Sequence, residues 1–201
     1  QIIAVNGTTP YEYSVNGGLH HPNMAYFNGY SPGTYTVEVF DSNNCVAGDI
    51  ITITEPSELD VTITPSDSNS YQIACNGGNT GYADIVVNGG TGPYTYTVLN
   101  IIGTTIASGN FVTSIHVPFL TAGTYTFVIT DAHGCPHDET IIYNEPSPIA
   151  HNFIATHVSC SGWSNGSLTD VVSGGVGTAT TYSYTWSPGG SNTYSLTSIP
   201  V

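Results

Sequence analysis

The sequence predicts an all-β protein made of tandem immunoglobulin-like antiparallel β-sandwich repeats of about 90 residues. The first observation is internal repetition at a fixed offset of 90 residues. The segment Gly33–Val37 returns as Gly123–Phe127, and the Glu-Pro-Ser of residues 55–57 returns at residues 145–147. The second is a supply of β-branched and aromatic residues between turns rich in Gly, Asn and Pro.

The repeat frame divides the chain into three parts. Residues 58–148 read as one complete repeat, residues 1–57 as the back part of another, and residues 149–201 as the front part of a third. A unit of this length is the size of a domain that folds independently. We therefore expect the sequence to be part of a longer tandem array of domains, joined by short Pro-containing linkers.

Short strands with period-two alternation follow one another along the complete repeat. Two of these strands each carry three apolar or aromatic residues that should share one face. They are Tyr94, Tyr96 and Val98 on the first strand, and Tyr125, Phe127 and Ile129 on the second. The turn before Tyr125 resembles a tyrosine corner, in which the hydroxyl bonds back to the loop backbone. The predicted strands are residues 60–64, 82–87, 94–99, 110–117, 124–130 and 140–143, with a hairpin over 101–109.

The composition excludes two classes of partner. The chain has no Lys or Arg among 201 residues, against 14 Asp and Glu, and only 7% of its residues are charged. An ordinary globular protein has about 25%. Nucleic-acid binding and attachment to anionic membranes both require cations, so neither is expected. No apolar stretch is long enough for direct membrane insertion.

The four cysteines predict an oxidised, extracellular protein. Cys75 and Cys135 both fall in the complete repeat and are predicted to form one disulfide. Cys45 and Cys160 then belong to repeats whose other cysteine lies outside this sequence. The alternative is four free, buried thiols. Zinc binding is disfavoured because the chain has no Cys-x-x-Cys.

Five ordered motifs of the complete repeat resemble the SprB-type repeat of Bacteroidetes cell-surface proteins, including a gliding-motility adhesin. These motifs are Cys75–Gly78, Gly89–Tyr96, Ala122–Thr126, Thr130–Cys135 and Glu145–Pro146. The resemblance implies export across the outer membrane, typically by type IX secretion, and an extracellular location on the bacterial cell surface. It does not by itself imply gliding.

Individual residues suggest two kinds of site, a calcium site and glycan attachment sites. Carboxylates near the two linkers make calcium the candidate cofactor, at Glu55, Asp60, Asp67 and Glu145. Two Asn-x-Ser/Thr sequences make Asn6 and Asn165 the candidate glycan acceptors. No Ser–His pairing or nucleophile elbow recurs, so no catalytic site and no enzyme activity are expected.

Three functions remain open at this point. The first is a structural and adhesive module, a stalk or filament whose partners are the neighbouring repeats of the same chain. The second is a carbohydrate-binding module of a secreted enzyme, which binds surface polysaccharide through an exposed aromatic platform. Its candidate aromatics are Tyr26, Phe27, Tyr30, Trp163 and Trp186, although Trp186 is expected to pack in a core. The third is a subunit of an extracellular filament or sheath that assembles with other subunits.

Overall fold

The computed structural model describes residues 2–22, 26–176, 182–186 and 195–197. These residues form strands, turns and loops, and the predicted all-β class is confirmed. Among them there is no helix long and apolar enough to cross a membrane. The chain divides into two compact units, Gln1–Ser57 and Glu58–Val201.

The first unit is a single antiparallel sheet of four strands in the order β2-β1-β3-β4. β3 and β4 form a long hairpin in which Gly33 pairs with Ile53 and Phe40 with Val46. β1 lies on the other side of β3, with Val15 opposite Val37. The strands are β1 (Glu12–Val15), β2 (His21–Pro22), β3 (Gly33–Phe40) and β4 (Val46–Ile53).

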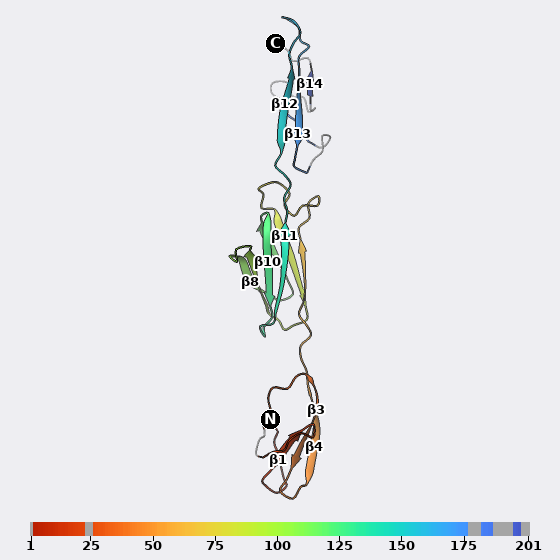
Figure 1. Ribbon diagram of the computed structural model, residues 1–201, viewed down its shortest axis with the longest axis vertical. Coiled ribbons are helices and arrows are strands. Elements are labelled where there is room, and N and C mark those ends of the chain that lie inside the picture. The colour runs from red at the N-terminus through yellow and green to blue at the C-terminus, as the bar shows by residue number, and fades with distance from the viewer. Residues whose placement is uncertain (1, 23–25, 177–181, 187–194, 198–201) are drawn as a thin grey trace. The chain divides into compact units, whose positions relative to one another are not determined.

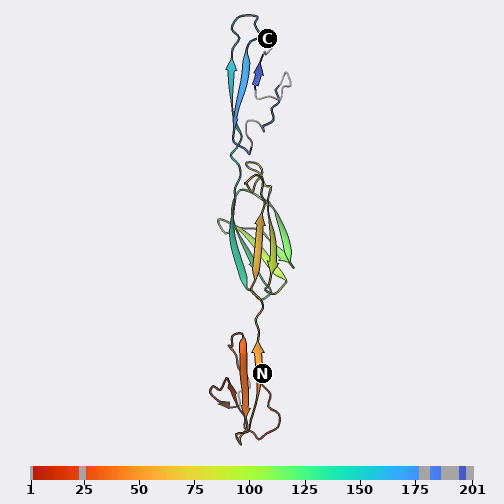
Figure 2. The same cartoon turned by 90° about the vertical axis from the view of Figure 1, so that its right-hand side faces the viewer.

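The second unit begins with a sandwich of seven strands in two sheets (Figures 1 and 2). One sheet has the order β5-β6-β9 and the other β11-β10-β7-β8. The strands are β5 (Asp60–Pro65), β6 (Gly81–Asn88), β7 (Tyr94–Asn100), β8 (Thr105–Phe111), β9 (Ser114–Leu120), β10 (Gly123–Thr130) and β11 (Pro136–Tyr143). We call this part, residues 58–148, the middle repeat.

The strand order of the middle repeat departs from a constant-type immunoglobulin domain in one respect. There the fourth strand joins the sheet of the first two strands. Here the fourth strand, β8, pairs with β7 instead, from Tyr94 opposite Phe111 to Leu99 opposite Thr105. The turn around Gly103 that joins β7 and β8 is too short to let β8 cross to the other sheet, which leaves three strands there.

The core of the middle repeat lies between the two sheets and follows the alternation in the sequence. On β6, residues of one face are buried and those of the other are exposed, in strict succession. Phe127 and Ile129 of β10 and Val98 of β7 are all fully buried. The predicted shared faces of β7 and β10 are therefore confirmed, with Tyr96 only half-buried.

Two predicted strands have different bounds in the structure. The strand expected over residues 110–117 is divided by a bend at Val112 and Thr113, so that β8 ends at Phe111 and β9 begins at Ser114. The last strand begins at Pro136, four residues before the predicted start. Pro136 is at the end of an edge strand, where its missing N–H costs no ladder hydrogen bond.

The rest of the second unit contains a small antiparallel sheet in the order β12-β13-β14. β12 and β13 form a hairpin in which His151 pairs with Val172 and Phe153 with Asp170. Residues 182–186 lie beside it, and the ring of Trp186 is 5.8 Å from that of Phe153. Trp186 is half-buried there, and Phe153 is itself 53% exposed. The strands are β12 (Ala150–Thr156), β13 (Ser167–Ser173) and β14 (Ser195–Thr197).

We predict that Phe127→Ala destabilises the middle repeat by about 3–5 kcal/mol, because it leaves a cavity at a fully buried position. The control is Val86→Ala on β6, whose side chain is 44% exposed and which should cost less than about 1 kcal/mol. Urea unfolding of both variants measures the difference. A cost for Phe127→Ala no larger than that of the control would contradict the assigned core.

Candidate functional site: the motif turns and the linker

A buried aspartate organises the turn between the last two strands of the middle repeat. The Oδ1 atom of Asp131 accepts hydrogen bonds from the backbone N–H groups of His133 and Cys135, each at 2.9 Å. Its Oδ2 accepts the N–H of Thr91 at 3.0 Å. One carboxylate therefore closes its own hairpin turn and fastens it to the Gly89–Gly90 turn that precedes β7.

The first unit repeats this arrangement at Asp41. Its Oδ1 accepts the N–H groups of Asn43 and Cys45, at 2.8 and 2.9 Å. Its Oδ2 accepts the N–H of Thr8 at 3.1 Å. The Asp-x-x-x-Cys spacing, which occurs in both repeats, thus places the backbone N–H of the cysteine where it donates to the aspartate.

These backbone donors favour the ionised form of each aspartate. The N–H of Cys135 is the largest cause that lowers the pKa of Asp131, followed among the hydrogen bonds by those from Thr91 and His133. The pKa of Asp41 is lowered in the same way, first by Cys45 and then by Thr8. Hydrogen bonds from several backbone N–H groups stabilise the ionised carboxylate more than its protonated form.

Tyrosine hydroxyls close further turns in all three parts of the chain. The Tyr125 hydroxyl donates to the carbonyl of Thr121 at 3.2 Å, and Tyr35 does the same to Ser31 at 2.7 Å, so the predicted tyrosine corner is confirmed. The Tyr94 hydroxyl donates to the carbonyl of Gly89 at 2.5 Å. The same bond recurs in the other two parts of the chain, from Tyr11 to Asn6 and from Tyr182 to Gly174.

The Glu-Pro linker that leaves the middle repeat is held by the Cys75–Gly78 turn, about 70 residues earlier in the chain. The Glu145 carboxylate accepts the Nδ2–H of Asn76 at 2.8 Å through Oε1 and the N–H of Gly77 at 2.7 Å through Oε2. The same Asn76 amide also donates to the carbonyl of Pro146 at 3.1 Å. We call these contacts the linker anchor.

Backbone contacts extend the linker anchor by one residue. The carbonyl of Asn144 accepts the N–H groups of both Gln72 and Ile73, each at 3.1 Å. In return, the N–H of Asn144 donates to the side-chain oxygen of Gln72 at 3.0 Å. The chain therefore leaves β11 along a fixed path, and Pro146 is fully buried.

The next residues of the linker contact the turn before residues 182–186. The N–H of Gly175 donates to the carbonyl of Ser147 at 2.8 Å. Gly174 has a φ of 81°, and a Cβ there would lie 2.1 Å from the carbonyl oxygen of Pro148. Only glycine fits this position, because any side chain would displace the linker.

The predicted Cys75–Cys135 disulfide is wrong for this structure, in which all four cysteines are free and exposed. Cys135 lies directly before the first residue of β11, whereas Cys75 lies beside Glu145, just after its last residue. An eight-residue strand spans roughly 25 Å, and a disulfide needs Cα atoms within about 7 Å. The prediction assumed that both cysteines occupied one end of the sandwich. Cys45 and Cys160 are likewise free thiols here.

The structure does not gather the four carboxylates predicted to bind calcium. Asp60 begins β5 opposite Asn88, and Glu145 follows β11 at the other end of the middle repeat. Asp67 accepts the N–H of Ser70 at 3.0 Å, and Glu55 is an exposed residue of the first unit. Among the described residues, no three His, Cys, Asp or Glu side chains lie close enough together to hold a metal ion.

The two predicted glycan acceptors are exposed but differ in their contacts. Asn6 has a φ of 70°, and its carbonyl accepts the Tyr11 hydroxyl. The Nδ2 atom of Asn165, which would carry a glycan, donates to the Ser159 hydroxyl at 2.7 Å. Asn165 would therefore lose a turn contact on modification.

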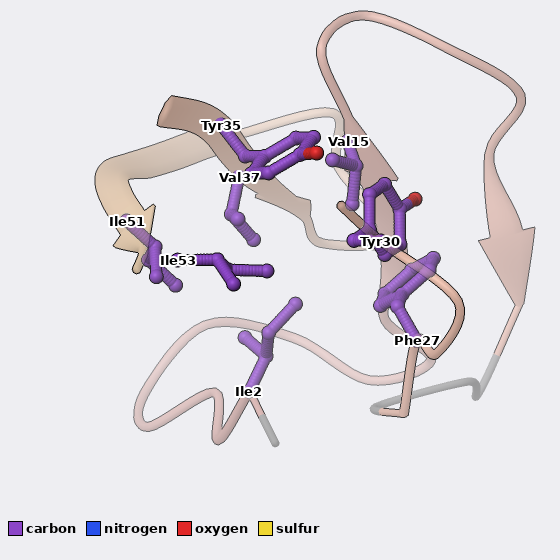
Figure 3. Close-up of a pocket in the computed structure, with 8 residues that line it drawn as sticks. All are labelled: Ile2, Val15, Phe27, Tyr30, Tyr35, Val37, Ile51 and Ile53. Carbon is purple, nitrogen blue, oxygen red and sulfur yellow. The ribbon is translucent and has the colours of Figure 1, made fainter. Parts of the chain in front are cut away.

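The aromatic residues considered for sugar binding are divided between the two units. Tyr26 and Trp163 are 69% and 56% exposed and belong to different units. Phe27 and Tyr30 line an apolar groove in the first unit (Figure 3). The middle repeat exposes Tyr82 and Phe119, which sequence reasoning did not select.

One of the segments that match a known family contains the Cys75–Gly78 turn and the strand that begins at Tyr94. Residues 68–101 and 152–191 match the SprB repeat. The chain carries two SprB-type repeat segments. The predicted resemblance is thereby confirmed for these two segments. The Ala122–Thr126, Thr130–Cys135 and Glu145–Pro146 motifs lie between the two segments and outside both. No curated protein matches the chain.

Sequence reasoning missed the linker anchor and the roles of Asp131 and Tyr94. The sequence does contain a signal of the linker anchor. Cys-Asn-Gly-Gly and Glu-Pro are both motifs of the repeat, and both lie outside its strands. Their contact depends on the strand order, since β11 must end beside the turn that precedes β6.

We predict that Asp131→Asn lowers the stability of the middle repeat at pH 7 and that the deficit shrinks as the pH falls. Because the folded pKa of Asp131 is depressed, its contribution is present above the unfolded value near 3.8 and is lost as the pH falls through the folded pKa. Thermal unfolding, followed on the amide resonances of β10 at pH 7 and pH 3, measures this.

The matched control is Asp138→Asn, which removes an exposed carboxylate of β11 without touching the turn. It should leave the melting temperature at pH 7 nearly unchanged. A deficit for Asp131→Asn that is equal at both pH values would contradict the role assigned to the charge.

Proposed function

We propose that this chain is a structural module of a bacterial cell-surface protein, in which successive SprB-type repeats form an extracellular stalk or filament. The observation that carries the proposal is the linker anchor. Glu145 is held by Asn76 and Gly77 on one side of the linker, and Ser147 is held by Gly175 on the other. A linker fixed in this way transmits orientation from one repeat to the next.

The composition supports the same role. A chain with a formal net charge of −14 and no Lys or Arg repels its neighbours weakly, which favours an extended array at low ionic strength. Trypsin-like proteases also find no cleavage site in it. Both properties suit a protein that works outside the cell, on the surface where proteins with SprB repeats occur.

The alternatives from the sequence have less support. A carbohydrate-binding module needs several aromatic side chains on one surface. Phe27 and Tyr30 share an apolar groove with Tyr35 in the first unit, but none of the candidate residues lies in the middle repeat. Adhesion to surface polysaccharide, gliding motility and type IX secretion belong to the proposal only as contexts in which such a stalk would act. Within the described residues, no grouping of side chains favours an enzyme.

We predict that Glu145→Ala releases the linker, because Asn76 and Gly77 lose the carboxylate that they share. The backbone amides of Ser147 and Ile149 should then show lower ¹⁵N order parameters, and the stability of the middle repeat should fall by about 1 kcal/mol. Small-angle scattering should detect a wider spread of conformations.

The control is Glu139→Ala, which removes an exposed carboxylate from β11 and should leave these amides as rigid as in the wild type. Asn76→Ala should reproduce the effect of Glu145→Ala, since it removes the other half of the same contact. Rigid Ser147 and Ile149 amides in both anchor variants would refute the proposed mechanical role.

A further inference from the structure

The outer face of the β5-β6-β9 sheet carries a cluster of aromatic and ionisable side chains that neither the turns nor the linker uses. On β6, Ala83 is buried in the core, so its neighbours Tyr82 and Asp84 lie on the opposite, exposed face. On β9, His116 lies opposite Asp84, and its ring centroid is 5.0 Å from that of Tyr82. The cluster therefore joins two neighbouring strands of the sandwich.

The side chains of this cluster are held in place. The Nδ1 atom of His116 lies 2.6 Å from Oδ1 of Asp84, and both side chains are about half exposed. An exposed pair of this kind contributes little to stability. Among the described residues, Nε2 of His116 and Oδ2 of Asp84 have no hydrogen-bond partner. The pair therefore presents two oriented polar atoms to a ligand.

The backbone of Tyr82 is fixed from below the sheet. Its N–H donates to Oγ of Ser66 at 3.1 Å, and its carbonyl accepts the hydroxyl of Tyr143 at 3.0 Å. Tyr143 belongs to the other sheet of the sandwich and is fully buried. The ring of Tyr82 is thus carried by a rigid strand, which lowers the entropy lost when a ligand packs on it.

A β-bulge places a second aromatic residue beside the cluster. The register shifts between Gly81 and Ala83, so that Pro118 and Phe119 of β9 both oppose Tyr82. A Cβ at Gly81 would lie 2.7 Å from a backbone carbonyl oxygen of β9, so the bulge requires glycine there.

The conformation of Phe119 is costly for the fold. Its φ is 64°, in the left-handed region that bulky residues avoid, and its side chain is 76% exposed. A ring exposed to this degree buries little apolar surface to offset the backbone strain. Strain of this kind concentrates at binding and catalytic sites. The ring of Phe119 is therefore explained better by a ligand than by the core.

These side chains suit a sugar. A sugar ring has an apolar C–H face, which packs on aromatic rings, and hydroxyls at its rim, which bond to carboxylate and imidazole groups. Thr64, opposite Asp84 on β5, adds an exposed hydroxyl to the polar row. The formal net charge of −14, with no Lys or Arg, disfavours an anionic polysaccharide.

We propose that the outer face of β6 and β9 binds a neutral polysaccharide of hexopyranose units. The sugar rings stack on Tyr82 and Phe119, and their hydroxyls donate to Asp84. This site goes beyond the stalk role and is particular to the middle repeat. Counted back from the Gly-Gly turns that follow β6 and β13, Ser167 and Thr169 stand at the positions of Tyr82 and Asp84.

The test titrates three neutral oligosaccharides, cellohexaose, maltohexaose and mannohexaose, into the ¹⁵N-labelled 201-residue chain. We expect at least one of them to cause saturable chemical-shift changes at Tyr82, Asp84 and His116. Hexagalacturonate, an anionic counterpart, should bind about tenfold more weakly at low ionic strength. Three results would each overturn the proposal: no binding of any neutral oligosaccharide, shifts confined to residues outside β6 and β9, or binding of hexagalacturonate that is at least as tight.

Variants separate binding from folding. Tyr82→Ala should weaken binding about tenfold, because one stacking contact is lost. The control is Ile142→Ala, which truncates a 59% exposed side chain on the other sheet and should change the affinity less than about twofold. Phe119→Gly should also weaken binding, but without lowering the melting temperature, because glycine relieves the strain at a φ of 64°. Unchanged affinity in Tyr82→Ala or in Phe119→Gly would contradict the proposal.

The result is distinguishable from that of the stalk proposal. Glu145→Ala, which releases the linker anchor, should leave the affinity for the oligosaccharide unchanged, because Glu145 makes its contacts with the Asn76–Gly77 turn. A loss of binding in this variant would contradict a site confined to β6 and β9.

Discussion

The contact between the Glu145 carboxylate and the Asn76–Gly77 turn determines the path by which the chain leaves the middle repeat. It joins a turn near the start of the repeat to the linker at its end, and it uses both carboxylate oxygens. The Asn144 carbonyl adds two backbone bonds at the same place. Since hydrogen bonds to an ionised acceptor are stronger than those between neutral groups, this anchor fixes the direction in which the chain leaves the sandwich.

The opposite end of the repeat uses the same chemistry. Asp131 collects three backbone N–H groups and joins the β10–β11 turn to Thr91. Asp41 does so in the first unit. In a protein without Lys or Arg, the side chains and backbone can stabilise a carboxylate only through N–H and O–H donors, those of His included. The motif residues therefore stabilise turns through the backbone, which leaves the flat faces of the sheets free to vary.

The sequence predicted the class of fold because alternation and turn chemistry act locally. The buried faces of β7 and β10 and the bond from the Tyr125 hydroxyl to Thr121 could be read from spacing alone. The disulfide could not, because it required knowing that Cys75 and Cys135 lie at opposite ends of β11. The linker anchor was hidden for the same reason, since Asn76 and Glu145 meet only through the sheet topology. The division at Val112 left no clear signal, because Asn110 to Val117 reads as one continuous strand.

The central claim is that the linker is anchored to the Cys75–Gly78 turn, and amide hydrogen exchange tests it most directly. The N–H of Gly77 donates to Glu145, and those of Gln72 and Ile73 donate to Asn144, although all three belong to a loop outside the strands. We predict that these three amides exchange far more slowly than an unstructured peptide of the same sequence, and that Gly77 loses its protection in Glu145→Ala. Exchange of Gly77 at the unstructured rate in the wild-type chain would contradict it.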